Sequence, residues 1–120
     1  MFGFMRTQNR IVSLPEFDAV PVDKRPALIC RPITAGEFPE LWAKFQKVAV
    51  RPIDATYSDD IAKLLDGVVI GWQNVLDING APLAFDIEKL PLVADVSQLV
   101  ALASRALDAR FDLNTDAEKN

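Results

Sequence analysis

Residues 61–85 read IAKLLDGVVIGWQNVLDINGAPLAF and carry the strongest periodic signal in the chain. In the first half of this stretch, apolar residues recur at the spacing of one helix face, namely Ile61, Leu64, Leu65, Val68, Val69 and Trp72. The Ser-Asp-Asp run that precedes them supplies capping oxygens and negative charge for a helix N-terminus. The pattern predicts a helix from about Asp59 to Trp72, in which Gly67 and Gly71 would each cost up to about 1 kcal/mol relative to Ala.

The second half of the same stretch predicts a tight turn. Asn79 and Gly80 both accept a positive φ, and the short apolar segments on either side favour a hairpin over about 75–83. Because Pro82 cannot donate to a strand ladder, such a hairpin is limited to the edge of a sheet.

Toward the N-terminus, the sequence predicts two strands and a helix. Residues 11–14 and 27–30 are mainly apolar, and the proline-rich connection between them favours a short antiparallel pair. Thr34 with Glu37 forms a capping box, in which each side chain satisfies a backbone N–H at the start of a helix. We expect that helix over about 35–48.

Toward the C-terminus, Asp95 with Gln98 forms a second capping box, and the apolar periodicity after it predicts a last helix that reaches about Arg110. Residues 113–120 are polar and are expected to fray. We therefore expect one α+β domain over residues 1–112. It consists of a small N-terminal antiparallel strand pair packed with three main α-helices and a short edge hairpin.

The composition argues against an enzyme. The 120 residues include no histidine and a single cysteine, Cys30, which stands among apolar neighbours and is expected to be buried. A lone thiol cannot form a Cys/His nucleophile pair or a thiolate zinc site, and the five dispersed glycines form no phosphate loop. We expect no catalytic residue and no cofactor. Lysine or carboxylate chemistry would require a deep pocket lined by Lys44 or Lys63.

One set of residues is spaced like part of a calcium-binding loop. Asp77, Asn79, Gly80 and Asp86 fall at its third, fifth, sixth and twelfth positions. Val75 occupies the first position, where calcium requires a carboxylate, and the last position should be a bidentate Glu. The turn interpretation explains the same residues more simply, so no metal is predicted.

Charge and hydropathy exclude two further classes of partner. The formal net charge is −4 and the pI about 4.7, with no run of Lys or Arg, which disfavours nucleic acid as a partner. No apolar run approaches the roughly 20 residues needed to cross a bilayer, and the apolar N-terminus is too short for a signal peptide. The single cysteine suits a reducing compartment. We expect a cytoplasmic protein that has no membrane partner.

The run GWQNVLDINGAPLAFDIEKL, residues 71–90, resembles the tail assembly chaperones of long-tailed phages and prophages. Members of that family typically have a helix that ends in Trp, a short acidic stretch that closes in Gly, then Pro, Phe and the start of another helix. The matching positions are Trp72, Val75, Asp77, Gly80, Pro82, Phe85, Glu88 and Leu90. The resemblance covers about residues 60–120, including the ending at 118–120. Positions that depart from the pattern are Gln73, Asn74, Ile78 and Asp86.

The resemblance implies a non-enzymatic role in virion assembly. Copies of such a chaperone coat the long helical tape measure protein, keep it soluble and help recruit tail tube protein in the host cell cytoplasm. Such families commonly also make a longer form by ribosomal frameshifting. The sequence leaves self-association open. The alternative is a structural virion protein of the tail, of the completion or terminator type, which would remain in the finished particle.

The expected protein-binding residues are large apolar side chains at the N-terminus and on the predicted helix faces. Tryptophan is a frequent interface anchor, although at helical spacings it is more often a core residue. The candidate contacts are Phe2, Phe4, Met5, Trp42 and Trp72.

Overall fold

Three short antiparallel strands form the sheet, in the order β1-β2-β3. The computed structural model describes residues 8–110, and within them β1 (Arg10–Val12) pairs with β2 (Ala27–Cys30), which pairs with β3 (Val69–Gln73). The predicted α+β class and the N-terminal strand pair are confirmed. The third strand was not predicted, and it makes β2 the central strand.

The predicted helix over 59–72 is wrong in its second half. Helix α2 (Tyr57–Leu65) ends in a turn that contains Gly67, and the chain then enters β3. Residues 68–70 are Val-Val-Ile, whose β-branched side chains favour an extended backbone over a helix. A short apolar run fits both the helical and the strand periodicity. Here the backbone pairing with β2 makes the segment a strand.

The other predicted helices lie close to their expected positions. Helix α1 (Phe38–Ala49) follows the capping box of Thr34 and Glu37, whose two reciprocal hydrogen bonds measure 2.8 and 3.3 Å. Helix α4 (Val96–Leu107) starts at the capping box of Asp95 and Gln98, with bonds of 2.8 and 3.1 Å. Between β3 and α4 the chain forms a short 3₁₀ segment, η2 (Ile87–Lys89), and one turn of helix, α3 (Leu90–Val93).

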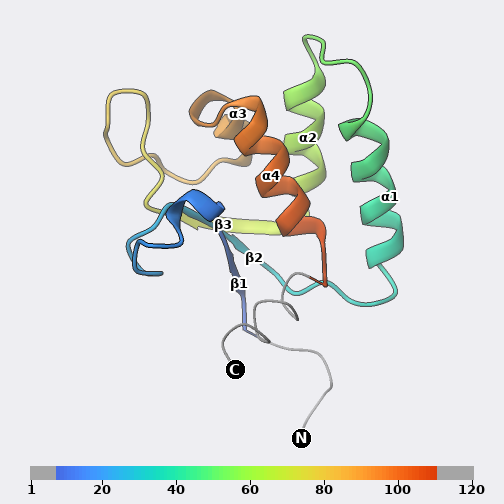
Figure 1. Ribbon diagram of the computed structural model, residues 1–120, viewed down its shortest axis with the longest axis horizontal. Coiled ribbons are helices and arrows are strands. Elements are labelled where there is room, and N and C mark those ends of the chain that lie inside the picture. The colour runs from blue at the N-terminus through green and yellow to red at the C-terminus, as the bar shows by residue number, and fades with distance from the viewer. Residues whose placement is uncertain (1–7, 111–120) are drawn as a thin grey trace, which may run out of the picture.

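The helices gather on one side of the sheet, as Figure 1 shows. Helix α4 contacts β1 and β2 directly, while α2 packs against α4 and α1 packs against both of them. The buried apolar side chains between these layers form one cluster within the described part of the chain. Its fully buried members include Val12, Leu28, Cys30, Ile61, Leu65, Val68, Leu99 and Leu107. The expected burial of Cys30 is thus confirmed.

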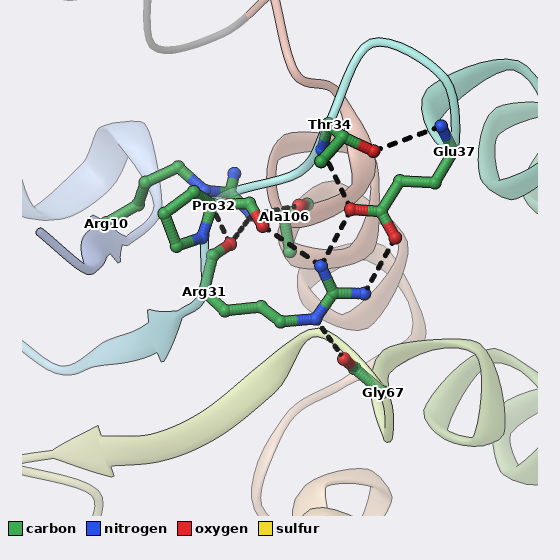
Figure 2. A network of polar contacts seen from close by, with 7 residues as sticks. All are labelled: Arg10, Arg31, Pro32, Thr34, Glu37, Gly67 and Ala106. Atoms are coloured by element: carbon green, nitrogen blue, oxygen red, sulfur yellow. Dashed lines mark hydrogen bonds and ion pairs between the residues drawn. The ribbon is translucent and has the colours of Figure 1, made fainter. Parts of the chain in front are cut away.

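A polar network joins the end of β2 to the helices (Figure 2). Arg31 donates to both carboxylate oxygens of Glu37, at 2.8 and 3.1 Å, and to the Gly67 carbonyl at 2.6 Å. The hydrogen bond from Arg31 lowers the pKa of Glu37 to about 2 from an ordinary 4.5. The Arg10 guanidinium donates to the carbonyls of Arg31 and Ala106, each at 2.9 Å. The network therefore ties β1 to the end of α4, and the end of β2 to Glu37 before α1 and to the turn after α2.

A hairpin loop leaves the sheet after β3 and extends away from the helices, at the left of Figure 1. Leu76 faces Pro82 in an isolated antiparallel bridge, so the predicted hairpin is confirmed. Gly80 has φ +82°, but Asn79 does not adopt a positive φ. The Asp77 carboxylate accepts two backbone hydrogen bonds from within the turn, at 2.8 and 3.0 Å, which explains the acidic residue there without a metal.

Candidate partner-binding groove

An open apolar groove of about 220 Å³ lies where the β1–β2 connection, the first residues after β3, and helices α3 and α4 meet. Of the thirteen residues that line it, only Asn74 and Gln98 are polar. The apolar lining residues are Leu14, Phe17, Pro26, Ala27, Leu28, Val75, Leu76, Leu90, Val93, Ala94 and Leu102. We call this feature the apolar groove.

The floor and the rim of the apolar groove differ in exposure. Leu28, Leu90 and Leu102 are buried parts of the hydrophobic core and form the floor. Leu76 is 50% exposed and lies on the rim. The apolar surface therefore continues from the core to solvent, which is the arrangement expected of a site that buries a partner's apolar side chains.

Two side-chain amides hold one wall of the apolar groove in place. Asn74 Nδ2 donates to the carbonyls of Asp23 and Arg25, at 3.0 and 3.1 Å. Gln73 Nε2 donates to the carbonyls of Val22 and Arg25, at 2.6 and 3.1 Å. These bonds join the end of β3 to a connection about 50 residues earlier in the sequence. They also engage the side-chain amide N–H groups of Asn74, one of the two polar residues that line the groove.

The β1–β2 connection is shaped by bonds of its own. A short 3₁₀ segment, η1 (Pro15–Phe17), directs Phe17 to the apolar groove. Arg25 Nε donates to the Val20 carbonyl at 3.0 Å, and Arg25 Nη2 donates to the Asp18 carbonyl at 3.2 Å. Because the guanidinium closes the connection on itself, a segment with three prolines keeps a defined shape without strand pairing.

The opposite wall is the corner between α3 and α4. The Ala94 N–H donates to the Leu90 carbonyl at 3.1 Å, and the capping box at the start of α4 then turns the chain. This corner brings Val93, Ala94 and Gln98 onto the groove. The same side chain, Gln98, thus caps the helix and borders the ligand space.

Exposed apolar side chains are concentrated on the segments around the apolar groove. Ten large apolar residues in the described part of the chain are exposed. Six of them lie on the β1–β2 connection or between β3 and the first turn of α4, namely Val22, Leu76, Ile78, Phe85, Leu92 and Val96. Of these six, Leu76 lines the apolar groove itself.

The structure places Trp72 on β3 and not at a helix end. Its Nε1 donates to the Leu83 carbonyl at 2.9 Å, and its ring meets Phe85 edge to face, with centroids 5.1 Å apart. The side chain is half-buried against the core. Trp72 therefore pins the returning arm of the hairpin, and it is not among the residues that line the apolar groove.

Trp42 belongs to a separate aromatic row on α1. Its ring lies 6.0 Å from that of Phe38 and 5.3 Å from that of Phe45, and the Arg110 guanidinium lies 5.6 Å from its centroid. Trp42 also does not line the apolar groove. The structure does not bring the two tryptophans into one site. The other expected contacts, Phe2, Phe4 and Met5, lie outside the described residues.

The lysines considered for catalysis do not line the apolar groove. Lys44 is 58% exposed and pairs with Glu40 at 3.1 Å, and Lys63 is 79% exposed, 3.9 Å from Asp60. Within residues 8–110, no group of three or more acidic, Cys or His side chains is placed to hold a metal ion. None of the helices in this range is long and apolar enough to cross a membrane.

Comparisons with family models, characterised proteins and solved structures give no match to this chain. The prediction from sequence also did not include the groove residues. Gln73 and Asn74, which stand out in the sequence only as departures from the pattern that the chain resembles, supply the two amides that hold the groove wall. The remaining lining residues have no shared sequence motif and meet only in the folded chain.

Proposed function

We propose that this chain is a non-enzymatic phage tail assembly chaperone that binds an apolar helical segment of the tape measure protein in the apolar groove. The observation that carries the proposal is the continuity of apolar surface from the buried floor of the groove to the exposed Leu76 on its rim. A groove of this kind suits the apolar face of an amphipathic helix, one of the common modes of peptide recognition.

The family resemblance supports the proposal through the hairpin and the α3 wall. Val75 and Leu90 both match the family pattern and line the apolar groove. Phe85 matches it and packs on Trp72, and Gly80 matches it at the positive φ of the turn. The pattern's helix that ends in Trp has no counterpart, since Trp72 is on a strand. The resemblance therefore bears on the proposal through the residues that follow β3.

Burial of apolar surface gives such binding a favourable free energy, which the cost of ordering the partners reduces. A tape measure protein exposes long apolar helical stripes, and each Å² of apolar surface removed from water contributes roughly 25 cal/mol before ordering costs. A groove whose floor is already buried in the core has less to order on binding than a flexible loop. Many copies along one helix would multiply a modest affinity.

The proposed setting is the host cell cytoplasm during virion assembly, with the tail tube protein as a second partner. Co-expression with a long helical fragment of the tape measure protein tests the proposal. We expect the fragment to become soluble and to co-purify with the chain. If the fragment stays insoluble and the two proteins separate, the chaperone function is wrong.

Mass spectrometry of purified particles separates this function from that of a structural tail protein. A chaperone acts before the particle is complete and is expected to be absent from it. Detection of the chain at a fixed copy number in mature particles would instead support the tail completion or terminator function.

A further inference from the structure

Negative charge is concentrated on the two segments that border the apolar groove. Residues 15–26 and 74–95 together carry seven acidic and three basic side chains. The rest of the described chain carries seven acidic and eight basic side chains. The acidic excess of the described residues therefore lies around the groove and not over the surface as a whole.

Two of these carboxylates are exposed and stand next to or near groove-lining residues in the sequence. Glu16 immediately precedes Phe17, and Glu88 stands two residues before Leu90. Both side chains are exposed, and within residues 8–110 no ion pair or side-chain hydrogen bond engages either carboxylate. Their charges are available to a partner.

Other carboxylates on these segments form hydrogen bonds or an ion pair within the chain. Asp77 accepts backbone hydrogen bonds in the hairpin turn, and Asp95 caps α4. Asp18 lies 4.0 Å from the Arg25 guanidinium, which offsets it. Three further cations lie near lining residues: Lys24 stands two residues before Pro26, Lys89 adjoins Leu90, and Arg105 donates to the Ser13 carbonyl beside Leu14. The two segments that border the groove nevertheless keep four more acidic than basic side chains.

From the apolar lining and this acidic rim, we infer that the apolar groove selects an amphipathic helix whose apolar stripe is flanked by Lys or Arg. The inference rests on the proposed function and specifies the chemistry of the partner. Opposite charges around an apolar contact steer encounter and suppress wrong partners, whereas a helix flanked by Glu would meet like charge on both rims.

Two synthetic helical peptides of about 20 residues test the inference, one with Lys and one with Glu beside the same Leu stripe. Binding to the full chain is measured by fluorescence anisotropy at low and high salt. We expect the Lys peptide to bind at least about tenfold more tightly at low salt. The ratio should fall toward one near 1 M salt, where the Debye length is about 3 Å.

A double variant that removes two of these negative charges tests whether they cause the preference for the Lys peptide. Glu16→Gln with Glu88→Gln should lower the preference for the Lys peptide several-fold. The matched control, Asp59→Asn with Asp66→Asn on and just after α2, removes the same charge away from the groove and should leave the preference unchanged.

The outcomes separate the inference from the function on which it rests. Equal binding of the two peptides at every salt concentration would overturn the inference and leave the groove as a binding site. An equal loss of preference in both double variants would also overturn it, because net charge and not the rim would then be responsible. If neither peptide binds, the groove function and the inference are both wrong.

Discussion

Asn74 donates from its side-chain amide to the Asp23 carbonyl, 3.0 Å away, and so joins the end of β3 to the β1–β2 connection. Asn74 is also the one non-glycine residue with a positive φ, +56°, in the described chain. The conformation turns the chain out of the sheet and toward Val75 and Leu76 of the apolar groove. Asparagine is tolerated in this conformation better than most residues.

Two substitutions at Asn74 separate its backbone role from its side-chain role. Asn74→Gly keeps the positive φ accessible and removes two partly exposed hydrogen bonds, so we expect a loss of about 1 kcal/mol in the free energy of unfolding. Asn74→Ala should lose about 1 kcal/mol more, because alanine is strained at positive φ. Urea denaturation measures both values. Equal losses in the two variants would contradict the backbone role.

Gly80 and Gly36 form a matched pair for the hairpin turn. Gly80 has φ +82°, whereas Gly36 has no positive φ, and a Cβ at either position would meet open space. We expect Gly80→Ala to cost about 1–2 kcal/mol of stability and Gly36→Ala to be neutral or slightly stabilising. Thermal unfolding of the two variants checks the difference. A Gly80→Ala variant as stable as the parent would show that the turn is not fixed as described.

The indole nitrogen of Trp72 predicts a difference between the two tryptophans. Trp72→Phe loses the hydrogen bond to the Leu83 carbonyl, while Trp42 donates no such bond within residues 8–110. Both changes reduce aromatic area to a similar degree. We expect Trp72→Phe to be about 1 kcal/mol more destabilising than Trp42→Phe. Chemical denaturation followed by circular dichroism avoids reliance on the altered fluorophores. The reverse order would contradict the pinning role of Trp72.

The Arg31–Glu37 pair predicts a pH dependence of stability. The hydrogen bond from Arg31 lowers the pKa of Glu37 to about 2, below its ordinary 4.5, so the stabilisation is complete above pH 4.5 and lost as pH falls toward 2. Both side chains are about one-third exposed, at 35% and 33%, and solvent screens the pair. We expect Glu37→Gln to cost about 0.5–1 kcal/mol at pH 7 and only a small part of that at pH 2, where the carboxyl is half protonated.

Glu40→Gln is the control for this titration. Glu40 forms an exposed pair with Lys44 on the same helix, with side chains 76% and 58% exposed. Its removal should change stability little at any pH. Stability measured by urea denaturation from pH 2 to 7 compares the variants. If the curves for Glu37→Gln and the parent stay parallel below pH 4.5, the pair does not titrate as described.

Sequence predicted the parts of the fold that are decided locally. The capping boxes at Thr34 and Asp95 need only residues three positions apart; α4 begins directly after Asp95, and α1 begins at Phe38, after the turn that Thr34 opens. The hairpin turn at Gly80 likewise depends on its own residues. The strand β3 was missed because its partner, β2, lies about 40 residues earlier, and the apolar spacing alone fits a helix.

The apolar groove could not be predicted from the sequence, because its lining residues lie far apart along the chain. Leu14, Val75 and Leu102 meet only after the sheet pairs and α4 packs across it. The predicted sites favoured the tryptophans, which are large and noticeable in the sequence. In the structure, Trp72 and Trp42 have packing partners within the chain, and smaller aliphatic side chains form the open surface.

The central claim, that a partner helix binds in the apolar groove, is tested most directly by two substitutions on the same hairpin. Leu76 lines the groove and is 50% exposed, whereas Ile78 is 87% exposed and does not line it. Isothermal titration calorimetry with a helical tape measure fragment compares Leu76→Gln with Ile78→Gln. We predict at least about fivefold weaker binding for Leu76→Gln and unchanged binding for Ile78→Gln. Equal affinities for the two variants would contradict the account.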